Sequence, residues 1–253
     1  MSQEMAIYYD ASKCTACRGC QAACKVWNEL PSPIDFNAGE FKGTFQNPPD
    51  LNPDTRLIIT FEERARENAY GVDWAFGRRS CMHCTDAACV NVCPSGSLYH
   101  DPDGTGLVIY DVDKCIGCQY CRSACPFDVP RHTGIGVAGG GIKINKWSGC
   151  IDCVCHGRAP ACVSTCQSNA LEWGPRDELI AKARKRVEVL HEKGFSDARV
   201  YGADECGGLH VINVLKYDLS MYQNLPEGAA PDGLTEALGY MKPLAALGAA
   251  GIV

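Results

Sequence analysis

The chain has 253 residues, 46% of them hydrophobic, so it is long enough for one large domain or two ordinary ones with a packed interior. Its formal net charge of −6 argues against a nucleic-acid partner, because such partners require basic surfaces. Its 18 cysteines are far more than a chain of this length usually carries, and the sequence is too long for a small disulfide-stapled secreted domain.

The N-terminal region leads into the first cysteine group. Residues 1–13 contain no apolar stretch of signal-peptide length, so we expect the protein to stay in the cytoplasm or to reach the periplasm folded, carried by a partner's signal. Group one reads Cys14-Thr-Ala-Cys17-Arg-Gly-Cys20-Gln-Ala-Ala-Cys24. Residues 31–60, rich in Pro, Asn and Gly, are predicted to form a loop that covers the surface or a partner.

The second and third cysteine groups flank a predicted β-hairpin. Group two consists of Cys81, Cys84, Cys89 and Cys93, and group three of Cys115, Cys118, Cys121 and Cys125. Between them, Asp103-Gly104 is a turn signal with short β-prone runs on both sides, at 97–100 and 107–110. Two cysteine groups around a small hairpin are the layout of a two-cluster ferredoxin.

The last cysteine group is followed by a predicted helix, a predicted strand and an apolar tail. A glycine-rich segment at 134–141 precedes this group and is predicted to be a flexible loop. Group four contains Cys150, Cys153, Cys155, Cys162 and Cys166. Apolar residues recur at helical spacing over 176–193, which predicts a surface helix that stops at Gly194, and 210–215 is predicted to be a strand. Residues 244–253 are entirely apolar but too few to span a bilayer, so they form either a small packed helix or a truncated membrane anchor.

The spacing of the cysteines indicates iron–sulfur clusters. Group three has the pattern C-x2-C-x2-C-x3-C-P of bacterial ferredoxins, group one repeats it without the proline, and group two is a variant with a longer loop. Disulfides between cysteines two residues apart are geometrically poor. Zinc is the alternative metal for repeated C-x2-C pairs, but zinc sites prefer two well-separated pairs. A zinc ion or a [3Fe–4S] cluster at one site stays an open alternative to four [4Fe–4S] clusters.

In two-cluster ferredoxins the fourth cysteine of each group binds the cluster of the other group. We apply this rule to groups two and three, which we call the inserted pair, and to groups one and four, which we call the outer pair. The expected ligands are Cys93, Cys115, Cys118 and Cys121 for cluster A; Cys81, Cys84, Cys89 and Cys125 for cluster B; Cys14, Cys17, Cys20 and Cys166 for cluster C; and Cys24, Cys150, Cys153 and Cys162 for cluster D. Either Cys153 or Cys155 is surplus, and we favour Cys153 as the ligand because it repeats the C-x2-C spacing. Cys206 is left over and is predicted to be a buried or an inert thiol.

The predicted fold class is therefore α+β, with two ferredoxin-like two-cluster units, one inserted in the other, long loops and a C-terminal helix. Residues 1–75 and 130–200 are expected to form the outer unit and 76–129 the inserted unit. The remaining residues, 201–253, are expected to supply a strand and the apolar tail.

The sequence offers redox centres without substrate chemistry. It contains no nucleophile–base arrangement and no nucleotide-binding loop in a strand–helix context. His83 and His156 lie inside cysteine groups and are expected to be hydrogen-bonded structural residues. The basic residues within or beside the groups either raise the reduction potentials of the clusters or only solvate the surface; these are Lys13, Arg18, Lys25, Lys114, Arg122, Arg131, Lys146 and Arg158.

Several segments resemble one family, the four-cluster iron–sulfur subunits of molybdenum- or tungsten-pterin oxidoreductases, and especially the β subunit of formate dehydrogenase. Besides the cysteine groups, the resemblance includes Gln46-Asn-Pro-Pro-Asp-Leu51, Gly207-Gly-Leu-His-Val211 and Lys242-Pro-Leu-Ala-Ala246. It implies a pterin-containing catalytic partner, a membrane or soluble electron-acceptor subunit, and a membrane-associated complex in which this chain relays electrons and has no catalytic residue. In membrane-bound members a transmembrane helix follows the Lys-Pro-Leu-Ala-Ala segment, whereas here no complete transmembrane helix is expected.

Three alternatives stay open beside a formate dehydrogenase subunit. The first is the equivalent subunit of an oxidoreductase that acts on nitrate, polysulfide, dimethyl sulfoxide or an aldehyde. The second is a zinc-binding scaffold, and the third is a free-standing ferredoxin, against which the apolar tail argues.

Overall fold

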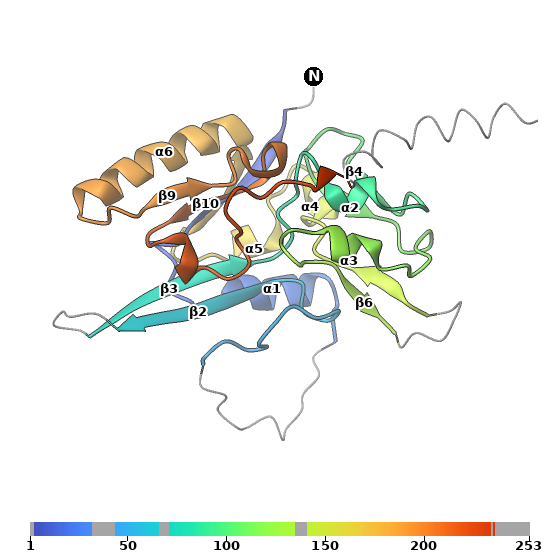
Figure 1. The fold of residues 1–253 in the computed structure, drawn as a ribbon, viewed down its shortest axis with the longest axis horizontal. Helices are drawn as coiled ribbons and strands as arrows, with labels where there is room; N and C mark the ends of the chain where they lie inside the picture. Colours follow the sequence, from blue (N-terminus) through green and yellow to red (C-terminus); the bar gives the residue numbers. More distant parts are fainter. Residues whose placement is uncertain (1–2, 32–43, 66–70, 135–140, 234, 236–253) are drawn as a thin grey trace, which may run out of the picture.

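The computed structural model describes residues 3–31, 44–65, 71–134, 141–233 and 235. The apolar tail, the expected C-terminal helix, most of the glycine-rich segment and part of the long loop lie outside these residues. The described fold mixes helices and strands, as predicted (Figure 1). None of its helices is long and apolar enough to cross a membrane.

A four-stranded sheet brings distant parts of the chain together. β1 (Met5–Asp10) pairs antiparallel with β8 (Leu171–Pro175) and parallel with β10 (Val211–Leu215), and β9 (Arg199–Tyr201) adds to the free side of β10. The strand expected at 210–215 is thus confirmed, and it lies beside the N-terminal strand.

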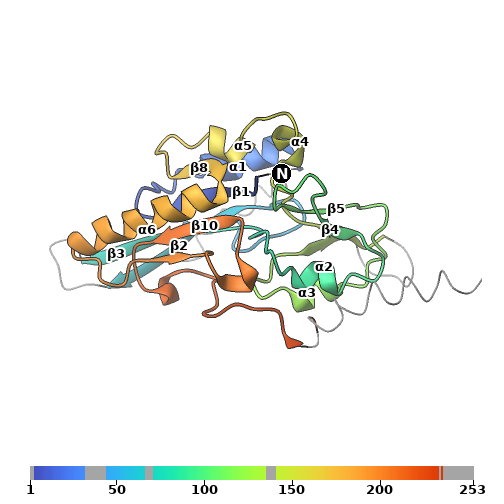
Figure 2. The same cartoon turned by 90° about the horizontal axis from the view of Figure 1, so that it is seen from above.

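Both faces of this sheet are buried. In β1, Ile7 and Tyr9 belong to the main core, whereas the alternate residues Ala6 and Tyr8 pack with the long helix α6 (Arg176–Glu192). This two-residue alternation is that of a strand covered on both sides. The predicted surface helix at 176–193 is therefore confirmed as α6, and Figure 2 shows it lying along the sheet.

Three two-stranded hairpins connect the cysteine groups. β2 (Ile58–Ala65) and β3 (Val72–Arg79) form a long hairpin that leads into group two. The loop predicted at 31–60 is therefore wrong for residues 58–60, which pair with β3 as the start of β2. β4 (Leu98–His100) pairs with β5 (Val108–Tyr110), which confirms the hairpin predicted between groups two and three. β6 (Arg131–Thr133) pairs with β7 (Lys143–Asn145) ahead of group four.

Five short helices carry the cysteine groups. They are α1 (Gly19–Trp27), α2 (Ala88–Asn91), α3 (Tyr120–Ala124), α4 (Ile151–Val154) and α5 (Ala161–Ser164). α1 packs against α5, and α2 packs against α3, so helices of groups one and four meet, as do those of groups two and three. Two short 3₁₀ turns, Glu205–Gly207 and Leu219–Met221, flank β10.

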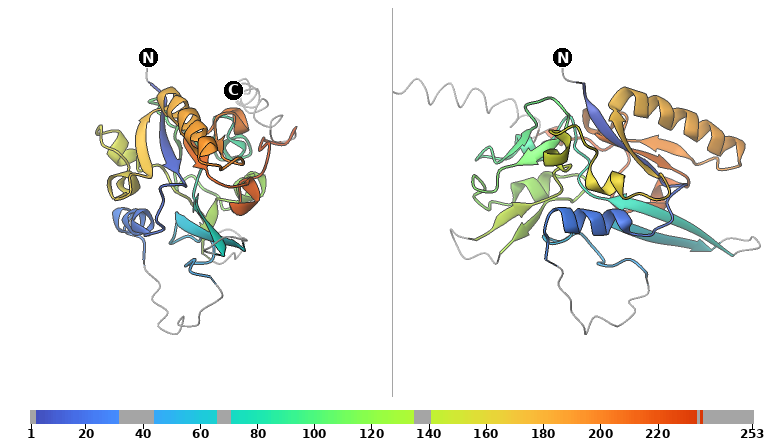
Figure 3. Two further views of the ribbon diagram at one scale, coloured as in Figure 1. Left: turned by 90° about the vertical axis from the view of Figure 1, so that its left-hand side faces the viewer. Right: turned by 180° about the vertical axis from the view of Figure 1, so that it is seen from behind.

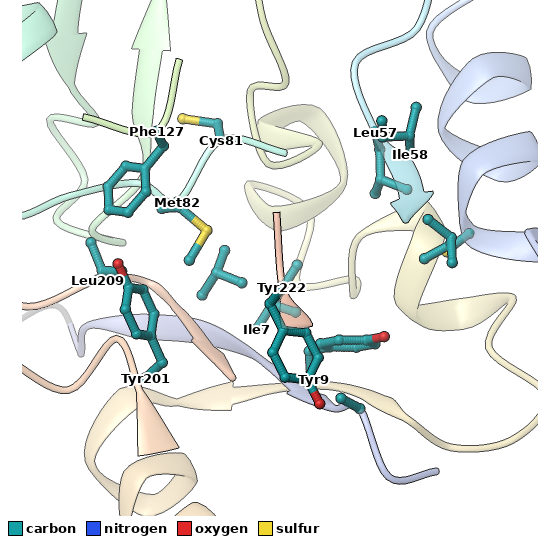
Figure 4. Close-up of a cluster of buried hydrophobic side chains, with 14 of the residues drawn as sticks. Ile7, Tyr9, Leu57, Ile58, Cys81, Met82, Phe127, Tyr201, Leu209 and Tyr222 are labelled. Atoms are coloured by element: carbon teal, nitrogen blue, oxygen red, sulfur yellow. The ribbon is translucent and has the colours of Figure 1, made fainter. Parts of the chain in front are cut away.

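The sheet with α6 lies at one end of the molecule, and α2, α3 and β4 lie at the other (Figure 3). The main core joins the two ends, because its residues come from nearly every part of the described chain. Figure 4 shows Cys81, Met82 and Phe127 in the same buried cluster as Ile7 and Tyr222. The cysteine groups are therefore built around the core of the protein and are not appended to its surface.

Candidate iron–sulfur cluster sites

All 18 cysteines are free thiols, so none is used in a disulfide. In the four groups most side chains are buried or half-buried, and three are exposed: Cys17, Cys118 and Cys155. Thiols buried in such number without disulfides are typical of cysteines that serve as metal ligands.

Groups one and three share an unusual loop conformation. The residue before the second cysteine has a positive φ in both, 53° at Ala16 and 74° at Gly117. The residue after that cysteine does too, 60° at Arg18 and 63° at Gln119. A left-handed residue beside a residue of ordinary conformation turns successive backbone N–H groups to the inside of a loop, where they can hold an anion. The N–H of Ala16 already points at the Sγ of Cys14, 3.4 Å away.

In the outer pair, cysteines of groups one and four are electrostatic neighbours. Burial raises the pKa of the Cys14 thiol, and the charges of Cys166 and Cys17 raise it further. Burial, followed by Cys162 and Cys150, raises the pKa of Cys24 to about 12. The last cysteine of each group thus lies near earlier cysteines of the other group.

The same crossing occurs in the inserted pair. Burial raises the pKa of Cys121 to about 12, and the next causes are the charges of Cys118, Cys93 and Cys115. Cys125, the last cysteine of group three, is half-buried; desolvation raises its pKa to about 11, and Cys81 contributes to the increase. Cys93 therefore lies among cysteines of group three, and Cys125 lies near group two.

Polar groups surround several of these sulfurs at equivalent positions. The last cysteines of groups two and four each contact a serine two residues further on, with Sγ–Oγ distances of 3.7 Å for Cys93–Ser95 and 3.8 Å for Cys166–Ser168. The N–H of Ile144 donates to the Sγ of Cys115 at 3.3 Å. Such donors stabilise thiolate sulfur and tune the potential of a bound cluster.

Two buried cations reach cysteine sulfurs. Arg78, at the end of β3, donates from Nη2 to the Sγ of Cys162 at 3.8 Å, and Lys146 donates from Nζ to the Sγ of Cys81 at 3.6 Å. Their residues are only 4% and 2% exposed. A buried cation requires a nearby anion, so these positions fit thiolate-bound clusters better than neutral thiols. Sequence reasoning named Lys146 among the candidate cations but missed Arg78, which lies outside the cysteine spacing.

Three of the other basic candidates pair with carboxylates. Lys114 pairs with Asp111, and Arg122 and Arg131 both pair with Asp128. The two histidines inside the groups are hydrogen-bonded, as predicted: the Nδ1 of His83 accepts from the N–H of Val108, and the Nδ1 of His156 contacts the carbonyl of Asp152. These contacts agree with structural roles for both histidines.

Cys206 was expected to be buried, and it is 3% exposed. It is hydrogen-bonded to the side chain of Cys84. The backbone explains this contact, because Cys84 forms a β-bridge with Leu209 and the N–H of Asp86 donates to the carbonyl of Cys206. The segment around residue 206 therefore covers one side of group two, which the spacing of the cysteines did not reveal.

Within the described part of the chain, no three His, Cys, Asp or Glu side chains converge closely enough to hold one metal ion. Four cysteines around a zinc ion must place their sulfurs about 2.3 Å from the same point. A [4Fe–4S] cluster instead takes one cysteine at each of four irons, so its four cysteine sulfurs lie farther apart than those around a single zinc ion. The donor set, the crossed neighbours and the buried cations therefore fit such a cluster.

Residues 72–176 match the model of a family described as the 4Fe-4S dicluster domain. The match spans cysteine groups two, three and four. Together with the arrangement of the cysteines, it defines the class of the molecule: an iron–sulfur protein that binds [4Fe–4S] clusters and transfers electrons.

Relatives that match most of the chain identify the family. The chain is 33% identical over 249 residues to the iron–sulfur subunit of the nitrate-inducible formate dehydrogenase of Escherichia coli (strain K12), covering 97% of this chain and 80% of that one. It is 36% identical over 214 residues to the β subunit of formate dehydrogenase 2 (cytochrome c-553) of Nitratidesulfovibrio vulgaris, and this match covers 82% of this chain and 92% of that subunit. The hydrogenase-2 operon protein HybA of Escherichia coli O157:H7 is 31% identical over 280 residues, covering 96% and 81%. The chain belongs to the family of formate dehydrogenase iron–sulfur subunits.

Proposed function

We propose that this chain holds four [4Fe–4S] clusters and relays electrons from a molybdenum- or tungsten-pterin formate dehydrogenase catalytic subunit to a downstream acceptor. The observation that carries the proposal is the crossing of the cysteine groups, in which the last cysteine of each group lies among the first cysteines of its partner group. The proposed ligands are Cys93, Cys115, Cys118 and Cys121 for cluster A; Cys81, Cys84, Cys89 and Cys125 for cluster B; Cys14, Cys17, Cys20 and Cys166 for cluster C; and Cys24, Cys150, Cys153 and Cys162 for cluster D.

The crossing also supports two nested units. The packing of α1 on α5 favours an outer unit built from 1–75 and 130–200, and the packing of α2 on α3 favours an inserted unit at 76–129. Residues 201–253 form the third part, with a strand and the apolar tail. The strand β10 of this part pairs with β1, so it packs directly against the outer unit.

The chemistry of the protein in this role is restricted to holding and insulating the clusters. Bound [4Fe–4S] clusters supply one-electron redox chemistry. The cysteine thiolates hold iron, the left-handed loops and Ser95 and Ser168 offer donors to the sulfurs, and the packed core excludes water. The catalytic partner supplies electrons, and an electron-accepting subunit, in the membrane or soluble, takes them.

A second candidate comes from the similarity to HybA, whose name associates it with a hydrogenase operon. In that case the chain would serve a hydrogenase or another oxidoreductase through the same clusters. The identity to formate dehydrogenase subunits is slightly higher, 32% to 36% against 31%. We therefore place the formate dehydrogenase partner first.

The test uses the complex purified anaerobically from the native organism. Four clusters require about 16 iron and 16 sulfide per chain. Reduction of a viologen dye by formate, but not by hydrogen, supports the formate dehydrogenase partner. Reduction by hydrogen alone favours the hydrogenase alternative, and iron near zero with stoichiometric zinc would refute the cluster proposal itself.

A further inference from the structure

Arg78 and Lys146 occupy swapped positions between the two cysteine pairs. Arg78 precedes Cys81 by three residues but contacts Cys162, which belongs to the outer pair. Lys146 precedes Cys150 by four residues but contacts Cys81, which belongs to the inserted pair. The cation that precedes group two therefore contacts the outer pair, and the cation that precedes group four contacts the inserted pair.

Neither cation is neutralised by a carboxylate among the described residues. Arg78 also donates to the Oγ of Ser80, and Lys146 donates to the carbonyls of Val108 and Trp147 at 2.5 and 3.0 Å. Arg79 is different: it follows Arg78 directly, is also buried, and pairs with both Asp50 and Asp128. Because an unpaired buried charge costs several kcal/mol, the anions that compensate Arg78 and Lys146 must be the cysteine thiolates with their clusters.

Trp147 connects the two cations. The guanidinium carbon of Arg78 lies 4.6 Å from the centroid of the Trp147 ring, and the ring of His83 meets the same indole edge-on at 4.9 Å. Three donors at this place are buried and find no hydrogen-bond acceptor among the described residues: the Nε of Arg78, the Nε1 of Trp147 and the Nε2 of His83. Since the Nδ1 of His83 accepts a hydrogen bond, its Nε2 carries the proton. Such donors require an acceptor, and the sulfurs of bound clusters supply one.

We infer that Arg78, Trp147 and Lys146 form a buried cationic junction that raises the reduction potentials of the clusters on its two sides, cluster B and the outer-pair cluster at Cys162. In a relay each cluster takes one electron from its donor, the catalytic subunit in the complex or dithionite in a titration, and passes it to the next. Reduction adds one negative charge to a site that is already negative, so a cation held within a few ångströms in a low-dielectric core favours the reduced form. A shared junction also lowers the repulsion between two reduced clusters, which helps both to be reduced together.

This inference rests on the proposed cluster-binding function, and it is tested by reduction potentials in the purified complex. The variants Arg78→Gln and Lys146→Met remove one charge each, and Arg78→Lys and Lys146→Arg keep it. Arg79→Gln is the matched control, because it removes the same charge one residue away, at a side chain already paired with carboxylates. Dithionite titrations followed by electron paramagnetic resonance give the midpoint potential of each cluster.

We expect each neutral variant to make reduction of the adjacent cluster at least tenfold less favourable, which is a shift of about 59 mV to lower potential for one electron. The charge-keeping variants and Arg79→Gln should stay close to the wild type. Unchanged midpoints in fully loaded neutral variants would overturn the inference. Should neutral variants lose iron while the charge-keeping variants and Arg79→Gln retain it, the junction is supported; iron loss in all of them overturns it. Wild-type protein without clusters would instead refute the proposed function.

Discussion

Cys153 and Cys155 lie two residues apart at the end of α4, yet their side chains have opposite surroundings: Cys153 is 3% exposed, whereas Cys155 is exposed to solvent. Burial also raises the pKa of Cys153, and Cys162 adds to this increase. Only Cys153 thus faces the interior where the other cysteines of its set lie.

The first prediction follows from this difference. Cys153→Ala should cost about one of four clusters, hence about a quarter of the bound iron. Cys155→Ala, the matched control, should retain full iron, because an exposed thiol two residues away contributes no ligand. Iron and sulfide analysis of the purified variants measures both, and the reverse pattern of loss would assign the ligand to Cys155.

The second prediction concerns the crossing of groups two and three. A double variant Cys93→Ala with Cys118→Ala should lose one cluster, because both residues serve cluster A. A double variant Cys93→Ala with Cys84→Ala should lose two, because its residues serve clusters A and B. The two variants remove equal numbers of cysteines, so iron content per chain distinguishes crossed from uncrossed ligands. Loss of two clusters in the first variant and one in the second would contradict the crossing.

The features that sequence reasoning reached are those encoded locally. The hairpin at 98–110 follows from its turn residues, α6 from its apolar period and Gly194, and the cysteine groups from their spacing. A strict short-range pattern fixes each of these, so little information from the rest of the chain is needed.

The features that the sequence did not predict depend on contacts between distant segments. Arg78 is the second-last residue of β3, and nothing near it in the sequence indicates its contact with Cys162, 84 residues away. The hairpin β2–β3 spans the expected boundary between residues 75 and 76, and its alternation is broken by charged residues. Cys206 lies beside Cys84 because Leu209, three residues further on, forms a β-bridge with Cys84. The spacing of the cysteines does not encode this contact. Long-range packing decided all three.

The third prediction concerns the loop of group three. Gly117 has φ +74°, and an added Cβ would lie 2.7 Å from the carbonyl oxygen of Ile142. Gly117→Ala combines this clash with the cost of a left-handed residue, about 1–2 kcal/mol, and should reduce the occupancy of cluster A. Gly96→Ala is the control, because Gly96 has φ +63° but no atom within 4 Å of its added Cβ. Equal iron loss in both variants would attribute the effect to backbone conformation alone.

The fourth prediction concerns the ion network around Arg131. Its Nη2 lies 2.9 Å from both Asp50 Oδ2 and Asp128 Oδ2, and its side chain is 7% exposed. The two carboxylates are nearly half-exposed, so solvent screens part of the interaction. We expect Arg131→Ala to lower stability by about 1–3 kcal/mol and the thermal midpoint by roughly 2–10 °C.

Arg64→Ala is the comparison variant for this network. Arg64 contacts Asp73 at 3.6 Å, and its side chain is 47% exposed. Asp73 is only 7% exposed, but it also accepts a hydrogen bond from the Oη of Tyr217 at 3.4 Å, so it keeps a partner when Arg64 is removed. Because solvent screens the exposed Arg64 charge, the pair contributes about 0–1 kcal/mol, and the thermal midpoint of Arg64→Ala should stay close to that of the wild type. Thermal unfolding monitored by circular dichroism compares the two variants. An equal decrease of the thermal midpoint in both would show that the buried network contributes no more to stability than the Arg64–Asp73 pair.

The fifth prediction concerns removal of the clusters. The small core around groups two and three consists of Ala87, Leu98, Val108 and Ile144 together with cysteines, whereas the core between the sheet and α6 includes no cysteine among its described members. Without iron, the first core retains too few apolar contacts to offset the conformational entropy of its loops. Anaerobic chelation should therefore raise amide hydrogen exchange in α2, α3, β4 and β5, while β1, β10 and α6 keep their protection. Hydrogen-exchange mass spectrometry of the loaded and the stripped protein measures this, and a uniform loss of protection would show that the clusters hold the entire fold together.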